Sequence, residues 1–180
     1  MRRMKGVFWL FVGLTATAAP LVAAGPVRVL SLARDGKVWI SFELAEGYTP
    51  EVREAIHSGL PITFTYDVDM RRNVPFWPDR ALASATIAVS VTYDNLTRRH
   101  SLSGSLDGRI EGTRVTEDEG EVRRWLTALD RLPLFDTKDL EANTEYYVRV
   151  RARTQPRDAW FFWPWDRGLV SSNASFTFIP

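Results

Sequence analysis

Two carboxylates lie two positions apart in a stretch where polar and apolar residues alternate. Asp67 and Asp69 therefore share one face of a predicted strand, about 6.5–7 Å apart along it. Paired carboxylates can bind calcium or act as general acid and base, and either aspartate could act together with Glu43. The simpler interpretation is that the alternation places acidic residues on a solvated strand face.

A second candidate is a row of basic side chains in the last third of the chain. Arg149, Arg151 and Arg153 alternate with apolar residues, so they lie on one strand face. Arginines on strand faces are usually solvated. Three of them on one face can also hold an acidic ligand, because guanidinium groups bind carboxylate and phosphate. We include these arginines in the candidate binding surface.

The most unusual feature is a run of aromatic residues that follows this row. It consists of Trp160, Phe161, Phe162, Trp163 and Trp165. Such a run either packs over an open end of the domain or is exposed. Exposed aromatic clusters mark binding surfaces or membrane contacts. The aromatic run is therefore the second part of the candidate binding surface.

Other chemistry has little support in the sequence. His57 and His100 have no cysteine partner and no metal-ligand spacing, so we interpret both as structural. Ser58-Gly59 lacks the flanking pattern of a hydrolase nucleophile, and no glycine-rich phosphate loop or dinucleotide motif occurs. We predict no catalytic, cofactor-binding or metal site, and a protein that is not an enzyme.

The elements that position the two carboxylates are predicted between residues 49 and 71. Thr49 can cap a helix that starts at Pro50, and Gly59 and Pro61 end it. From there the period changes to two, which predicts a strand with one buried face at the centre of a sheet. The buried face comprises Ile62, Phe64, Tyr66, Val68 and Met70.

Alternation predicts that most of the remaining elements are strands. We expect a hairpin, a three-stranded meander, a longer helix, and two strands near the end of the chain. These cover residues 27–33 and 38–44, then 81–93, 97–106 and 109–115, then 117–131, and finally 140–152 and 174–178. The predicted fold class is mainly β (β-rich α+β), an antiparallel Ig- or fibronectin III-like β-sandwich with one short and one longer helix.

The N-terminal residues have the three parts of a secretory signal peptide. Three basic residues among the first five precede an apolar run, and Val22-Ala23-Ala24 offers small residues where a signal peptidase cleaves. Residues 1–24 are therefore predicted to be removed, which leaves 25–180 as a single domain. The alternative is an uncleaved membrane anchor, because residues 6–24 are nineteen residues without charge.

Charge and cysteine content limit the class of protein further. The whole chain has a formal net charge of +1, whereas residues 25–180 have 20 basic and 22 acidic residues, or −2. This balance gives no sign of binding to nucleic acid or to an anionic membrane surface. The chain has no cysteine, so an exported domain must be stabilised by its core, which favours a bacterial envelope compartment.

One segment resembles the strand entry of fibronectin type III and related sandwich domains. In residues 140–152, a leucine, a turn and Tyr146 precede Val148, Val150 and Ala152, which share one face. In those domains a tyrosine hydroxyl bonds back to the preceding turn. The resemblance implies the same role for Tyr146.

The chain as a whole resembles a bacterial family called domain of unknown function 4390. The resemblance is carried by the strand at 39–44, Glu-Ala-Ile-His-Ser-Gly-Leu-Pro at 54–61, the strand and basic residues at 64–72, Tyr-Asp-Asn-Leu-Thr at 93–97, and Trp125-Leu126. The Ser-Gly-Leu-Pro block is the most specific piece, whereas the aromatic run departs from the family pattern. The resemblance implies an envelope location and suggests an accessory role beside a sensor histidine kinase, without an established activity.

We therefore expect an exported bacterial envelope protein that acts as a non-enzymatic binding or accessory module. It would be periplasmic, or anchored to the inner membrane by its N-terminal segment. Its partner would be a protein or an envelope ligand, with peripheral membrane contact through the aromatic run. The alternative is a hydrolase or lyase that acts on envelope carbohydrate through Asp67 and Asp69.

Overall fold

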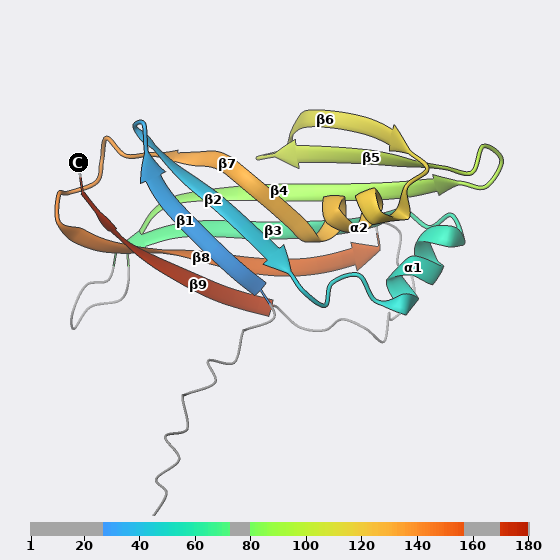
Figure 1. The fold of residues 1–180 in the computed structure, drawn as a ribbon, viewed down its shortest axis with the longest axis horizontal. Helices are drawn as coiled ribbons and strands as arrows, with labels where there is room; N and C mark the ends of the chain where they lie inside the picture. Colours follow the sequence, from blue (N-terminus) through green and yellow to red (C-terminus); the bar gives the residue numbers. More distant parts are fainter. Residues whose placement is uncertain (1–26, 73–79, 157–169, 180) are drawn as a thin grey trace, which may run out of the picture.

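A computed structural model describes residues 27–72, 80–156 and 170–179, which form two packed layers of strands with two short helices (Figure 1). The elements in chain order are β1 (Val27–Arg34), β2 (Lys37–Leu44), α1 (Pro50–His57), β3 (Ile62–Arg72), β4 (Arg80–Asp94), β5 (Arg99–Leu106), β6 (Arg109–Thr116), α2 (Glu119–Thr127), β7 (Ala128–Asp136), β8 (Thr144–Pro156) and β9 (Val170–Phe178).

The strands form two antiparallel sheets of unequal size. A three-stranded sheet has the order β1-β2-β7, and a six-stranded sheet has the order β6-β5-β4-β3-β8-β9. The smaller sheet crosses one face of the larger one diagonally, and α2 covers the neighbouring part of the same face (Figure 1). The predicted mainly β, sandwich-like fold is confirmed.

Strand β3 is the centre of the larger sheet, as its alternation predicts. It lies between β4 and β8 and pairs with both over its whole length. All five of its predicted inward side chains are buried, each with 3% exposure or less. The Tyr66 ring packs on Phe42 of the smaller sheet, with the ring centroids 4.5 Å apart. The outward side chains of β3 therefore lie on the open face of the six-stranded sheet.

The helix before β3 begins and ends where its sequence predicts. The Thr49 side chain accepts a hydrogen bond from the Val52 N–H at 3.4 Å, and Pro50 occupies the first turn. Gly59 has a φ of +85°, a conformation that residues with a Cβ rarely adopt. This stop directs the chain into β3.

The helix expected at residues 117–131 is shorter than predicted, and a strand that was not predicted follows it. Helix α2 ends at Thr127, and β7 continues from Ala128 to Asp136 in place of the last helical turn and a loop. Among the described strands, β7 pairs only with β2, so it is an edge strand there. Pro133 is tolerated there because an edge strand leaves N–H groups unpaired on one side.

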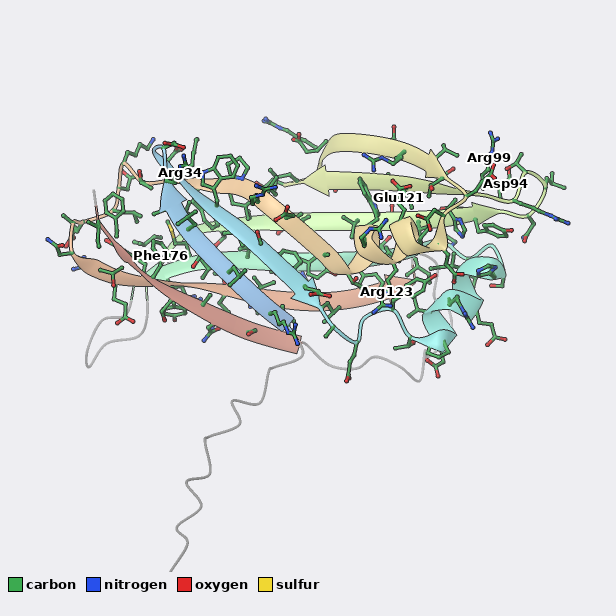
Figure 2. The ribbon with its side chains drawn as sticks, viewed as in Figure 1. Arg34, Asp94, Arg99, Glu121, Arg123 and Phe176 are labelled. Carbon is green, nitrogen blue, oxygen red and sulfur yellow. The ribbon has the colours of Figure 1, made fainter. Side chains whose placement is uncertain are left out.

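The tyrosine role implied by the fibronectin-like segment is confirmed. Tyr146 is buried, and its hydroxyl accepts a hydrogen bond from the Glu141 N–H at 2.8 Å. On the neighbouring strand β9, Phe176 (labelled in Figure 2) packs on the Tyr146 ring, with the centroids 6.0 Å apart. The hydrogen bond between Tyr146 and Glu141 holds the turn that leads into β8, the strand that carries the arginine row.

Candidate binding surface

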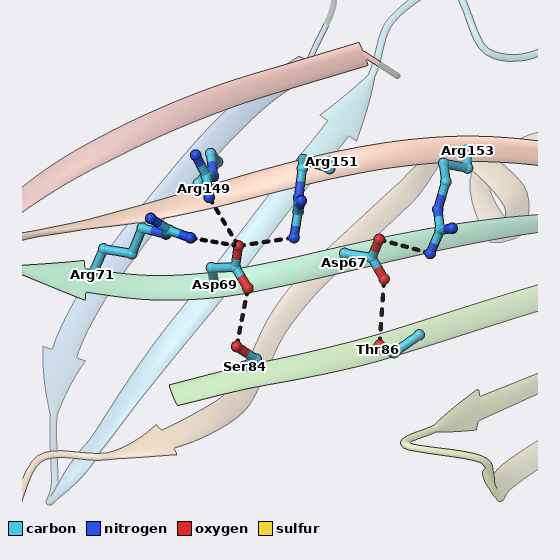
Figure 3. A network of polar contacts seen from close by, with 8 residues as sticks. All are labelled: Asp67, Asp69, Arg71, Ser84, Thr86, Arg149, Arg151 and Arg153. Carbon is cyan, nitrogen blue, oxygen red and sulfur yellow. Dashed lines mark hydrogen bonds and ion pairs between the residues drawn. The ribbon is translucent and has the colours of Figure 1, made fainter. Parts of the chain in front are cut away.

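The predicted carboxylates and the predicted arginine row meet on the open face of the six-stranded sheet. Asp69 lies opposite Arg149 in the β3–β8 register, and Asp67 lies opposite Arg151. On the other side of β3, strand β4 adds hydroxyl groups (Figure 3). We call this set the arginine–aspartate cluster; it comprises Asp67, Asp69, Arg71, Ser84, Thr86, Arg149, Arg151 and Arg153.

Asp69 is the centre of the cluster. Its Oδ2 lies 3.0 Å from Nη2 of Arg151, 3.2 Å from Nη2 of Arg149 and 3.8 Å from Nη2 of Arg71. The Ser84 hydroxyl donates a hydrogen bond to the other carboxylate oxygen at 3.0 Å. Only 5% of Asp69 is exposed. One nearly buried carboxylate therefore orients three guanidinium groups.

This environment keeps Asp69 ionised. Burial alone would raise the pKa of Asp69, but the hydrogen bonds from Ser84 and Arg149, together with the positive charges of Arg151 and Arg71, lower it. A carboxyl group with a lowered pKa cannot store a proton near neutral pH. Asp69 is therefore suited to holding the guanidinium groups in position and unsuited to acting as a general acid.

Asp67 forms the more exposed end of the cluster. Arg153 donates to Asp67 Oδ2 at 2.7 Å, and the Thr86 hydroxyl donates to Oδ1 at 3.4 Å. Arg153 is opposite Thr65 in the register, so its side chain reaches diagonally to Asp67. Arg151 reaches diagonally to Asp69 in the same way. Arg151 and Arg153 are thus each two residues along β8 from the position opposite their carboxylate, whereas Arg149 lies directly opposite Asp69.

The cluster carries more positive than negative charge. Four arginines surround two aspartates, which leaves an excess of two positive charges among these residues. The Arg151 side chain is 33% exposed and that of Arg153 is 45% exposed. Their guanidinium groups have five donors each and use only part of them on the carboxylates. These two arginines can therefore also bind an anion from solvent.

Small hydroxyl side chains surround the cluster on the same face. They come from β3, β4, β5 and β9, whose outward positions are set by the strand registers. They are Thr63, Thr65, Ser90, Thr92, Ser101, Ser103, Ser105, Ser171, Ser175 and Thr177. Hydroxyl groups donate and accept hydrogen bonds, so the face can contact an anionic or a sugar-like surface around a central basic patch.

The third carboxylate considered for acid–base chemistry lies elsewhere. Glu43 is exposed on β2, between the buried residues Phe42 and Leu44, so it points away from the interior on the outer face of the three-stranded sheet. Asp67 and Asp69 are on the outer face of the other sheet. Glu43 therefore cannot act together with either aspartate on one substrate.

The two histidines, which the sequence did not link to each other, lie side by side in the fold. The rings of His57 and His100 lie 5.9 Å apart, and the Tyr93 ring contacts both. Burial and the neighbouring His57 lower the pKa of His100, which favours its neutral form. Within residues 27–72, 80–156 and 170–179, no three His, Cys, Asp or Glu side chains are arranged to hold a metal ion.

The aromatic half of the predicted binding surface is not placed by the structure. Trp160, Phe161, Phe162, Trp163 and Trp165 lie outside the described residues, so their role stays a prediction. None of the helices in the described part of the chain is both long and apolar enough to cross a membrane.

A family comparison agrees with the resemblance of the sequence. Residues 28–159 match the model of the family described as Domain of unknown function (DUF4390). The chain belongs to this family. The match begins in β1 and includes every member of the arginine–aspartate cluster, whereas β9 lies beyond it. Searches of curated proteins and of solved structures gave no match to this DUF4390 protein.

Sequence reasoning found five members of the cluster but did not bring them together. Arg71, Ser84 and Thr86 were not candidates, because serine and threonine are common on solvated strand faces and Arg71 belongs to an arginine pair. The outward parity of β3 and β8 was the available signal. That these two strands are neighbours was not visible, since they are about 80 residues apart in the chain, as the Asp69–Arg149 contact shows.

Proposed function

We propose that this DUF4390 protein is an exported, non-enzymatic binding module of the bacterial envelope. It holds an anionic group, phosphate or carboxylate, of an envelope ligand or a partner protein on the arginine–aspartate cluster. The observation that carries the proposal is the pair of partly exposed arginines, Arg151 and Arg153, fixed in position by buried or partly buried aspartates. The envelope location rests on the predicted signal peptide and on family resemblance.

The geometry supports binding because the arginines are ordered before a ligand arrives. A free arginine side chain loses rotamer freedom when it binds, and this loss weakens the interaction. Here Asp67 and Asp69 already hold the guanidinium groups in a row along β8 (Figure 3). An anion that meets this row gains charge-assisted hydrogen bonds at a smaller entropic cost.

The test compares two double variants that remove the same charge. Arg151→Gln with Arg153→Gln removes the exposed donors of the cluster, whereas Arg98→Gln with Arg109→Gln removes two exposed arginines outside it. Calorimetry with soluble polyphosphate and with poly-glutamate as probes measures the affinity of the protein in the form that cells produce.

We expect the cluster variant to bind the better probe at least about tenfold more weakly, which corresponds to about 1.4 kcal/mol. The control variant should stay close to the unchanged protein. Equal weakening in both variants would show that only the overall charge matters and would contradict the proposed site. Absence of binding by the unchanged protein to either probe would contradict the ligand class.

A further inference from the structure

Strand β1 exposes two large apolar side chains on the outer face of the three-stranded sheet, next to the polar residues Lys37, Ser41 and Glu43 of β2. Leu30 is 73% exposed and Leu32 is 59% exposed, and both lie on this face of β1. Trp39 is opposite Leu32, and its indole N–H donates to the Arg34 carbonyl at 3.2 Å. A hollow of about 730 Å³ opens beside these side chains. It is lined by Leu30, Ser31, Leu32, Arg34, Asp35, Trp39, Ser41, Asp130 and Arg131.

Arginines border the apolar residues along β1. The outward side chains of this strand are, in order, Arg28, Leu30, Leu32 and Arg34. The Arg34 side chain is 73% exposed at the β1–β2 turn (Figure 2), where it pairs with the exposed Asp35 at 3.2 Å. Long arginine side chains can lie along an apolar surface while their charged ends reach phosphate groups. Two leucines flanked by two arginines therefore suit a bilayer surface, where the leucines can contact acyl chains and the arginines can contact head groups.

The sequence that precedes β1 suggests which surface covers this face. Residues 6–24 carry no charge, and only Gly25 and Pro26 separate them from the first residue of β1. Three residue steps span at most about 11 Å, so β1 begins close to the end of the apolar run. Both predictions for the N-terminus, a signal before cleavage and a retained anchor, place this run in the membrane.

We propose that the outer face of the three-stranded sheet is a membrane-contact surface that lies on the phospholipid bilayer. Leu30 and Leu32 enter the head-group region, and Arg28 and Arg34 bind lipid phosphates. This contact lies on the opposite layer from the arginine–aspartate cluster and does not depend on the proposed function. With the smaller sheet on the bilayer, the open face of the larger sheet points away from the membrane (Figure 1).

The chain contains no cysteine, so single cysteines can report the depth of chosen positions. Leu30→Cys and Leu32→Cys test the proposed contact. Ile110→Cys is the matched control, since Ile110 is 75% exposed but lies on β6, at the far edge of the larger sheet. The full chain of each variant is labelled with a polarity-sensitive fluorophore and reconstituted into vesicles of phosphatidylethanolamine and phosphatidylglycerol, with and without nitroxide-labelled lipid.

We expect the labels at positions 30 and 32 to lie about 5–10 Å deep, so their emission rises and is quenched by the nitroxide lipid. The label at Ile110 should stay in water and remain unquenched. Adding Arg28→Gln and Arg34→Gln to Leu30→Cys should reduce the quenching. The same emission at positions 30 and 110 would overturn the proposal.

Two further outcomes would also overturn it. A label at position 30 that becomes apolar without lipid quenching, and more so at higher protein concentration, would mean that a second copy covers the face. A Ser175→Cys label on the open face of the six-stranded sheet serves as the orientation control. Quenching at Ser175 together with none at Leu30 would mean that the opposite face meets the bilayer.

Discussion

At the scale of the residue, Asp69 shows how a nearly buried charge is kept on an open sheet face. Its two oxygens accept hydrogen bonds from Ser84, Arg149 and Arg151. Removing one partner of a buried ion pair usually costs more than the pair itself contributes, because the remaining charges stay unpaired. Asp69 is therefore the residue on which the geometry of the binding surface depends most.

We predict that Asp69→Asn lowers the free energy of unfolding by about 1–3 kcal/mol, because hydrogen bonds to a charged group are lost. Asp67→Asn should cost less than about 1 kcal/mol, since its partner Arg153 is nearly half exposed and screened by solvent. Urea titrations of both variants at neutral pH measure the difference. Equal losses would mean that Asp69 does not organise the cluster. Because the pKa of Asp69 is lowered in the folded protein, the stability that its carboxylate contributes is fully present above the ordinary pKa of an aspartate. This stability is lost as the pH falls through the lowered pKa.

His100 is the second residue whose charge state depends on the fold. Burial is the main reason for its lowered pKa, and His57 adds to it, while the Thr116 backbone and Glu119 oppose it. The unfolded chain then takes up a proton more readily than the folded protein. Folding is favoured fully above the unfolded pKa of about 6.5 and less as the pH falls below it.

We predict that the urea midpoint of the unchanged protein decreases between pH 8 and pH values below about 6.5. In His100→Gln this decrease should become smaller, because the group that resists protonation is gone. His57→Gln is the control: its side chain is 47% exposed, so most of the decrease should remain. The same pH dependence in His100→Gln and in the unchanged protein would contradict the assignment to His100.

At the scale of the element, β3 separates stability from binding by the parity of its residues. Phe64 is fully buried, whereas Thr65, the next residue, lies on the open face beside Arg153. We predict that Phe64→Ala costs about 3–5 kcal/mol, because burial is lost and a cavity remains. Thr65→Ala should cost under about 1 kcal/mol. Denaturant titrations that give equal losses would contradict the orientation of the strand.

The edge strand β7 shows a different relation between element and sequence. Leu129, Leu132 and Leu134 are partly buried against the core, so the strand contributes to packing without a clear period of two. Its register with β2 shifts twice, which breaks the alternation that identifies a strand. The sequence pattern of such a strand does not identify it as a strand, whereas its pairing with a neighbouring strand does.

At the scale of the whole molecule, the two layers have different outer faces. The six-stranded sheet presents arginines and hydroxyl groups, whereas the three-stranded sheet presents Leu30, Leu32 and a hollow lined by apolar and charged side chains. The core between them is built mainly from the inward residues of the strands, so most of the residues on the two outer faces are not part of it. A sandwich of this kind can carry two independent contacts, one on each side, and a variant of one face should leave the other intact.

The sequence by itself determined the elements with strong local patterns. The cap at Thr49, the stop at Gly59 and the alternation of β3 predicted where this part of the fold begins, ends and buries its side chains. These features depend on neighbouring residues, and local sterics and burial decide them. The family resemblance and the hydroxyl contact of Tyr146 were also predicted correctly.

Only the tertiary structure decided which of these patterns meet. The arginine row of β8 became part of a site when β3 paired with β8, and Glu43 was separated from the aspartates when β2 joined the other sheet. The end of α2 at Thr127 likewise follows from the pairing of β7 with β2. Strand pairing between distant segments depends on the packing of the whole core, so the local sequence does not contain it.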